Sequence, residues 1–136
     1  MKFNLMLLAL ACAAVQIRAQ AQVQVQAADG KTLFAKNCAA CHQASGLGIP
    51  GAFPALKGDA LVQADPAIVI ATVLKGRAGM PSFAASLDDD KLGAIITYAR
   101  GAWGNRAGAV TTAEVAAVRN ASSAAAATQE KGTIIH

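Results

Sequence analysis

The stretch Cys38-Ala39-Ala40-Cys41-His42 places two cysteines three residues apart, with a histidine directly after the second. This is the C-x-x-C-H pattern of covalent haem attachment. Each thiol can add to one vinyl group of a haem, and the two intervening residues separate the sulfurs suitably within one turn of backbone. The His42 imidazole is then held beneath the iron, where it can occupy one axial position. The sequence therefore predicts one covalent haem c.

Three other interpretations of the two cysteines compete with haem attachment. A thioredoxin-like redox pair needs a βαβ pattern around it and has no use for the adjacent histidine. A structural zinc site needs four ligands, and the only other histidine, His136, ends a polar tail. A disulfide between Cys38 and Cys41 would close a very short and strained ring. Haem attachment is favoured over all three because a second feature downstream supports it independently.

That second feature is Gly79-Met80-Pro81, where Gly and Pro predict an irregular loop. A methionine thioether is the usual partner of histidine on the iron of electron-transfer haem proteins. The other methionines, Met1 and Met6, lie in a predicted signal segment. A lone methionine commonly fills a gap in a core, but a loop rich in Gly and Pro is a poor place for that role. We therefore expect His42 and Met80 to be the two axial ligands of the iron.

The composition agrees with a cofactor inside the core. The 136 residues suffice for one domain. Hydrophobic residues make up 54% of the chain, but 34 of them are alanine and only six residues are aromatic. A small domain with so few large apolar side chains buries little surface when it folds. A haem would supply a large, flat apolar surface for these side chains to pack against.

Residues 1–21 have the pattern of a secretory signal. Lys2 is the short positive start, residues 5–15 form an apolar run too short to span a bilayer, and Ala19-Gln20-Ala21 is a cleavage site. We expect a periplasmic protein whose mature chain begins at Gln22. Two alternatives stay open: the segment remains as an uncleaved anchor, or Cys12 carries a lipoprotein-type cleavage.

Removal of this segment changes the charge and the cysteine count. Cys12 is lost, which leaves two cysteines for the haem and none for a disulfide. Loss of Lys2 and Arg18 lowers the basic residues from 12 to 10, against 8 acidic residues. Two haem propionates would cancel most of the remaining charge. The sequence therefore gives no sign of a nucleic-acid partner, and we expect membrane contact only through a partner complex.

Capping residues and apolar periodicity predict an all-α domain. Residues 22–28 are expected to be a linker, residues 29–119 the domain, and residues 120–136, rich in Ser, Ala, Thr and Gln, a disordered tail. N-cap residues mark the starts of the predicted helices, and glycine or asparagine marks several of their ends. The predicted helices run from Asp29 to about the haem cysteines, from Pro66 to Lys75, from Asp88 to Trp103, and from Thr112 to Arg119.

Residues 43–58 are predicted to form a loop around the haem, since Gly and Pro dominate them. Phe53, with Ile49 and Leu56, has a spacing that could line a haem face. A histidine ligand normally donates its second ring N–H to a carbonyl, which orients the ring. Pro50 and Pro54 are both plausible sources of that carbonyl, and the sequence does not choose between them.

Over residues 29–119 the chain resembles the small class I cytochromes c of bacterial periplasms. Three segments carry the resemblance: Gly30-x-x-x-Phe34 before the Cys-His motif, Gly79-Met80-Pro81, and Ile95, Tyr98 and Arg100 in the late helix. The resemblance implies three to five helices wrapped around one covalent haem. It also implies that Gly30 and Phe34 meet Ile95 and Tyr98 where the first and last core helices cross.

Three stretches resemble more narrowly the cytochrome subunits of quinoprotein dehydrogenases and cytochrome domains attached to oxidases: Phe53-Pro54-Ala55-Leu56, Gly79-Met80-Pro81-Ser82-Phe83, and Tyr98-Ala99-Arg100 through Trp103-Gly104-Asn105. This resemblance implies a one-electron carrier with redox protein partners, a dehydrogenase or an oxidase, and no catalytic residues. Two alternatives remain. The chain could be a tightly bound subunit of such a complex, or a haem enzyme or sensor with an open iron site. Met80 argues against the second.

Overall fold

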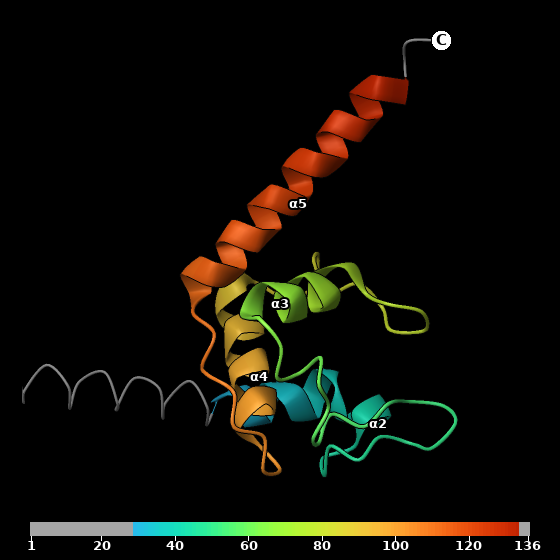
Figure 1. Cartoon of the computed structure of the whole chain (residues 1–136), viewed down its shortest axis with the longest axis vertical. Helices are drawn as coiled ribbons and strands as arrows, with labels where there is room; N and C mark the ends of the chain where they lie inside the picture. The colour runs from blue at the N-terminus through green and yellow to red at the C-terminus, as the bar shows by residue number, and fades with distance from the viewer. Residues whose placement is uncertain (1–28, 134–136) are drawn as a thin grey trace, which may run out of the picture.

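The computed structural model describes residues 29–133, and the predicted signal segment and linker lie outside them. The described residues form helices joined by loops, without a β-strand, which confirms the all-α prediction. The helices are residues 29–37, α2 (Ala39–His42), α3 (Pro66–Lys75), α4 (Asp89–Gly101) and α5 (Thr112–Thr133). Figure 1 shows the first helix crossing one end of α4 while α3 and α5 lie toward the other end. In the described part of the chain, no helix has both the length and the apolar character needed to cross a bilayer.

The starts of α3 and α4 follow from their capping residues. The Asp65 carboxylate accepts a hydrogen bond from the backbone N–H of Ala67 at 2.8 Å, and the Asp88 carboxylate accepts one from Lys91 at 2.9 Å. Each cap satisfies a backbone N–H that has no partner within the helix. Gly76, with a φ of 76°, ends α3. These boundaries of α3, and the start of α4, are confirmed as predicted.

Helix α5 begins as predicted but continues much further. Thr111 and Glu114 form a capping box, in which each backbone N–H donates to the other residue's side chain. The backbone N–H and the hydroxyl of Thr111 both donate to the Glu114 carboxylate, and these two hydrogen bonds lower the pKa of Glu114. The prediction of a disordered tail from residue 120 was wrong for residues 120–133, which are helical. The run Ala124–Ala127 explains the difference, because alanine has the highest helix propensity.

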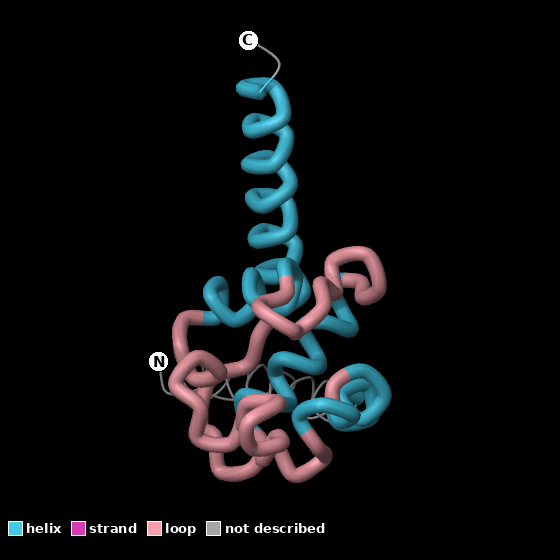
Figure 2. The backbone as a smooth tube through the Cα atoms, turned by 90° about the vertical axis from the view of Figure 1, so that its right-hand side faces the viewer, coloured by secondary structure: helices cyan, strands magenta, loops and turns pink. Residues whose placement is uncertain are grey.

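The far part of α5 stands away from the rest of the molecule, as Figures 1 and 2 show from two directions. The side chains at its start instead join the core. Val115 is fully buried and Val118 is partly buried against the core cluster. That cluster comes from the first helix, α3, α4, α5 and the segments just before α4 and α5: Phe34, Val69, Ile70, Leu74, Leu87, Leu92, Ile95, Ile96, Val110 and Val115.

The first helix and α4 cross with Gly30 and Phe34 against Tyr98, as the resemblance implied. A methyl group built on Gly30 would lie only 2.1 Å from the backbone oxygen of Ala94 and 2.9 Å from Cβ of Tyr98. Only glycine therefore permits this close approach of the two backbones. One turn later, the ring of Phe34 packs 5.5 Å from that of Tyr98. α4 ends at Gly101, so Trp103 lies beyond the helix predicted for it, but its ring still packs 5.2 Å from that of Phe34.

We predict that Gly30→Ala separates the two helices and lowers the free energy of unfolding by roughly 1–3 kcal/mol, the usual cost of overpacking. Gly101→Ala is the matched control, because Gly101 is also helical and an added methyl group there meets nothing within 4 Å. It should be neutral or slightly stabilising. Denaturant unfolding of the haem-loaded protein measures both, and equal stability of the two variants would contradict the crossing.

Candidate haem-binding site

The predicted attachment residues lie on a single turn of backbone. Cys38 is the N-cap of the short helix α2, and its carbonyl accepts hydrogen bonds from the N–H of Cys41 at 3.2 Å and of His42 at 2.9 Å. All three side chains are partly buried, and both cysteines are free thiols. Burial, with a smaller effect from Cys41, raises the pKa of the Cys38 thiol to about 11. The thiol is therefore protonated at neutral pH.

The ring of His42 is oriented by one of the two candidate prolines. Its Nδ1–H donates to the backbone carbonyl of Pro54 at 3.0 Å. This hydrogen bond sets the tautomer, because Nδ1 carries the proton and Nε2 keeps its lone pair. A histidine ligand oriented by a carbonyl in this way is a stronger donor to a metal. Pro50 contributes instead to the surface beside Pro54.

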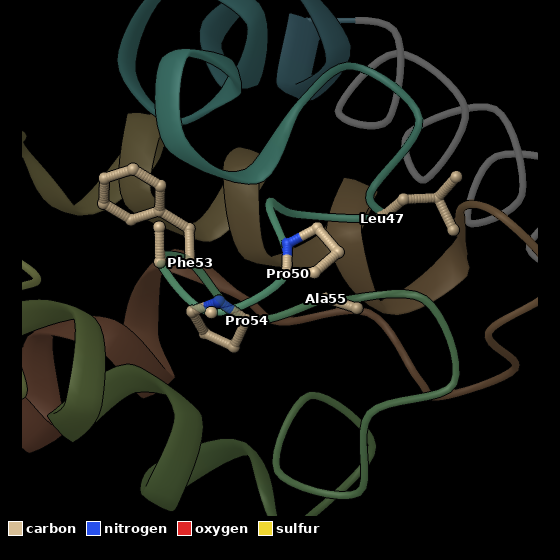
Figure 3. A pocket seen from close by; sticks show the side chains of 7 residues that line it. Leu47, Pro50, Phe53, Pro54 and Ala55 are labelled. Atoms are coloured by element: carbon tan, nitrogen blue, oxygen red, sulfur yellow. The ribbon is translucent and has the colours of Figure 1, made fainter.

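The loop that follows His42 is apolar and partly exposed. Ile49 and Phe53 pair through two backbone hydrogen bonds of 2.9 and 2.8 Å, which turn the loop back on itself. A hollow of about 410 Å³ lies on this loop, and its lining includes Pro50, Phe53 and Pro54 (Figure 3). Phe53 and Ile49 remain 36% and 37% exposed, and Leu47 is 55% exposed. A cofactor with an apolar face would cover surface of this kind.

Two buried polar residues hold this loop and the segment after it against α4. The Asn105 side chain accepts from the N–H of Gly58 and donates to the carbonyls of Leu56 and Ala99, all within 3.0 Å. The Arg100 guanidinium donates to the carbonyls of Val62, Ala64 and Gly108, at 2.7 to 2.9 Å. Both side chains are 4% exposed. Sequence reasoning missed both roles, since most of these partners lie 36 to 49 residues away along the chain.

Met80 lies on a separate loop between α3 and α4. Its N–H donates to the carbonyl of Arg77 at 2.9 Å, and the N–H of Arg77 donates back to the carbonyl of Met80 at 3.2 Å. A methyl group built on Gly76 would lie 2.5 Å from the Met80 carbonyl, and the φ of Gly76 is positive, so glycine is required where this loop closes. The Met80 side chain is partly buried.

The same loop is also tied to the end of α3. The Ser82 hydroxyl donates to the carbonyl of Leu74 at 2.6 Å, and the N–H of Phe83 donates to the carbonyl of Val73 at 3.2 Å. The backbone is therefore held on both sides of Met80, by the hydrogen bonds with Arg77 before it and by those of Ser82 and Phe83 after it. The described contacts join His42 to Pro54, but none of them joins Met80 to His42 directly.

The residues present fit a covalent haem with two axial ligands. Two free thiols on one turn can form the two thioethers, and the Nδ1–H bond of His42 leaves Nε2 available for the iron. Met80 could offer a thioether sulfur from a loop whose backbone is held by hydrogen bonds. The exposed apolar side chains of Ile49 and Phe53 match the apolar faces of a porphyrin. Among residues 29–133, no group of three or more His, Cys, Asp and Glu side chains gathers as a metal site.

Comparison with known proteins agrees with this chemistry. Residues 25–98, more than half of the chain, match the family model described as cytochrome c oxidase, cbb3-type, subunit III. The chain is 36% identical over 87 residues to the cbb3-type cytochrome c oxidase subunit CcoP of Azospirillum sp., covering 58% of this chain and 29% of that one. It is 35% identical over 94 residues to cytochrome c-552 of Thermus thermophilus, covering 57% of this chain and 70% of that one.

A further similarity is to a subunit of a larger enzyme. The chain is 29% identical over 104 residues to the cytochrome c subunit of the quinone alcohol dehydrogenase of Gluconacetobacter polyoxogenes. The match covers 67% of this chain but only 22% of that subunit. This chain therefore spans a small part of its dehydrogenase and oxidase relatives.

Proposed function

Because the chain belongs to the c-type cytochrome family described as cytochrome c oxidase, cbb3-type, subunit III, we propose that it carries single electrons on one covalent haem c. We assign the two thioethers to Cys38 and Cys41 and the axial positions to His42 and Met80. The observation that carries this proposal is the hydrogen bond from Nδ1 of His42 to Pro54, which leaves Nε2 free for iron.

The bound haem would supply an iron that alternates between the ferrous and ferric states. The chain's own residues tune that exchange. The thioether of Met80 is a soft, neutral donor, and it favours ferrous over ferric iron, so it raises the reduction potential. Burial among apolar residues acts in the same direction, because a low dielectric penalises the extra charge of the oxidised state. With both positions occupied in each state, electron transfer needs little rearrangement.

We further propose that the protein works in the periplasm with a redox protein partner. The predicted signal over residues 1–21 supports export, and an N-terminus at or near Gln22 in the purified protein would bear this out. Retention of Lys2 in that protein would instead favour a membrane anchor. The partner is expected to be a dehydrogenase or an oxidase, because the relatives are named as subunits of such enzymes.

A second candidate function is that of a tightly bound subunit of a quinoprotein dehydrogenase. The similarity to the alcohol dehydrogenase and gluconate 2-dehydrogenase cytochrome c subunits favours it. Size-exclusion chromatography of a periplasmic extract separates the two candidates. A free carrier elutes as a small protein, whereas a subunit elutes with its catalytic partner, which mass spectrometry identifies.

A spectroscopically monitored potentiometric titration tests the electron-transfer function. We expect the haem-loaded protein to take up one electron reversibly, with a Nernst slope of about 59 mV for a one-electron couple. The reduced protein should not bind carbon monoxide, because Met80 occupies the position that a gas would take. Rapid binding of carbon monoxide by the reduced protein would point to an open iron site and hence to an enzyme or a sensor.

A further inference from the structure

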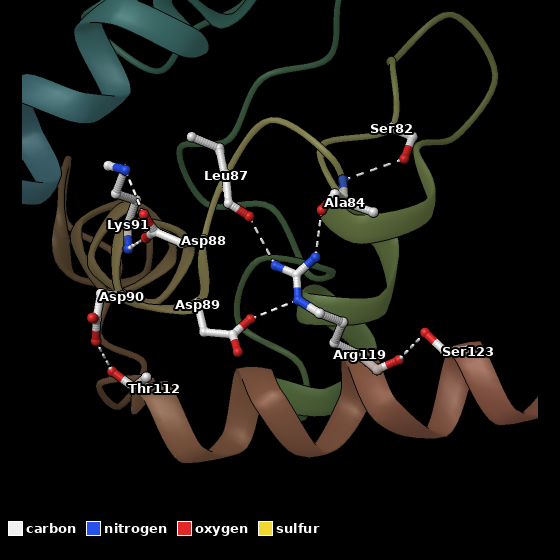
Figure 4. A network of polar contacts seen from close by, with 10 residues as sticks. All are labelled: Ser82, Ala84, Leu87, Asp88, Asp89, Asp90, Lys91, Thr112, Arg119 and Ser123. Atoms are coloured by element: carbon white, nitrogen blue, oxygen red, sulfur yellow. Dashed lines mark hydrogen bonds and ion pairs between the residues drawn. The ribbon is translucent and has the colours of Figure 1, made fainter.

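The Arg119 side chain of helix α5 donates hydrogen bonds to the segment that follows Met80. Its Nη1 donates to the carbonyl of Ala84 at 2.5 Å and its Nη2 donates to the carbonyl of Leu87 at 2.8 Å. Its Nε donates to the carboxylate of Asp89 at 2.7 Å. Figure 4 shows the guanidinium at the centre of these three contacts. Arg119 thus joins α5, the loop and the first turn of α4.

These contacts continue a chain of hydrogen bonds that reaches the Met80 loop. The N–H of Ala84 donates to the hydroxyl of Ser82 at 3.3 Å, and that hydroxyl donates to the carbonyl of Leu74 at the end of α3. Ala84 is only four residues after Met80, so a fixed Ala84 limits how far the Met80 backbone can move. The loop is therefore held from α3 on one side and from α5 on the other.

We infer that Arg119 is a positioning residue for the sixth iron ligand: by holding the carbonyls of Ala84 and Leu87, it keeps the Met80 loop closed on the haem. This inference rests on the proposed ligation of iron by Met80. Arg119 lies outside residues 25–98, the part of the chain that matches the family model. Helix α5 would thereby control, from outside the matched part, how readily external ligands reach the iron.

The geometry favours a role in closing the loop over a role in general stability. The Arg119 and Asp89 side chains are 24% and 27% exposed, so their ion pair is partly screened by solvent and contributes little by itself. The contact with the Leu87 carbonyl is partly buried, and that with the Ala84 carbonyl is exposed. Both have a charged donor, which makes them stronger than hydrogen bonds between neutral groups. Their loss should act first on the segment that they hold, by local opening.

Cyanide binding to the oxidised, haem-loaded, full chain tests the inference, because cyanide must displace the Met80 sulfur. We expect Arg119→Gln to bind cyanide about tenfold more tightly and faster than the wild type, a factor that one charge-assisted hydrogen bond commonly supplies. Arg119→Lys keeps one charged donor group, so its cyanide affinity should lie between those of the wild type and Arg119→Gln. Asp89→Asn removes the ion pair but leaves both carbonyl contacts, so it should have a smaller effect than Arg119→Gln.

Val115→Ala is the control for general destabilisation, because Val115 is fully buried in α5 and donates nothing to the loop. It should lower the melting temperature without an equal gain in cyanide affinity. The inference is overturned if Arg119→Gln binds cyanide as the wild type does, or if Val115→Ala matches its effect. If the oxidised wild type lacks the far-red sulfur-to-iron band, the proposed ligation by Met80 is wrong, and the inference about Arg119 falls with it. If the band is present but the cyanide results disagree, only the inference about Arg119 is wrong.

Discussion

Met80→Ala should remove the weak far-red charge-transfer band of sulfur-to-iron ligation from the oxidised protein and lower its reduction potential. The potential should fall by on the order of 0.1–0.3 V, a substantial part of the roughly 0.8 V range that axial ligands set. The physical reason is the loss of a soft, neutral donor that favours ferrous iron. The iron should also become open to cyanide and carbon monoxide. Absorption spectroscopy and potentiometry measure these changes.

The fold should survive this substitution, because Cys38, Cys41 and His42 still hold the haem. Met80→His separates the loss of sulfur from the loss of a ligand. It should also abolish the far-red band and lower the potential, but it should keep the iron closed to carbon monoxide, since an imidazole replaces the thioether. If Met80→Ala leaves both spectrum and potential unchanged, Met80 is not the ligand, and an open-site enzyme or sensor becomes the better account.

Replacing both attachment cysteines should convert covalent haem into extractable haem. In Cys38→Ala/Cys41→Ala no thioether can form, so acid–acetone extraction should remove essentially all of the haem from the polypeptide. Each single variant keeps one thioether and should retain covalent haem. Denaturing electrophoresis followed by a haem stain measures the outcome directly.

Cys12→Ala is the matched control, because Cys12 lies in the predicted signal segment and has no part in attachment. Its haem should remain covalent. The thioether assignment is wrong if the colour of the wild-type protein leaves with the solvent, or if the double variant still holds its haem after denaturation.

Local signals in the sequence were sufficient for much of the fold. Asp65 and Asp88 cap their helices, and Gly76 ends α3, because each acts on backbone groups within a few residues. The close helix crossing at Gly30 was implied by the family resemblance, and its physical reason is that a methyl group there would meet the backbone of Ala94. The extent of α5 was missed, because residues 120–136 were interpreted by their content of Ser, Ala, Thr and Gln and not by the helix propensity of their alanines.

The supports of the candidate site were harder to predict. The choice of Pro54 over Pro50 depends on how the pairing of Ile49 with Phe53 turns the loop back toward His42. Arg119 could be seen in the sequence only as a basic residue on a helix, since its partners are 30 to 35 residues earlier. Such contacts become visible only when the chain has been folded.

We propose that His42 and Met80 ligate the iron of the haem held by Cys38 and Cys41. The far-red absorption spectrum of the oxidised wild-type protein at neutral pH tests it most directly. We expect the sulfur-to-iron charge-transfer band together with a low-spin, six-coordinate spectrum. A spectrum without that band, or a high-spin spectrum with an open coordination position, would contradict it.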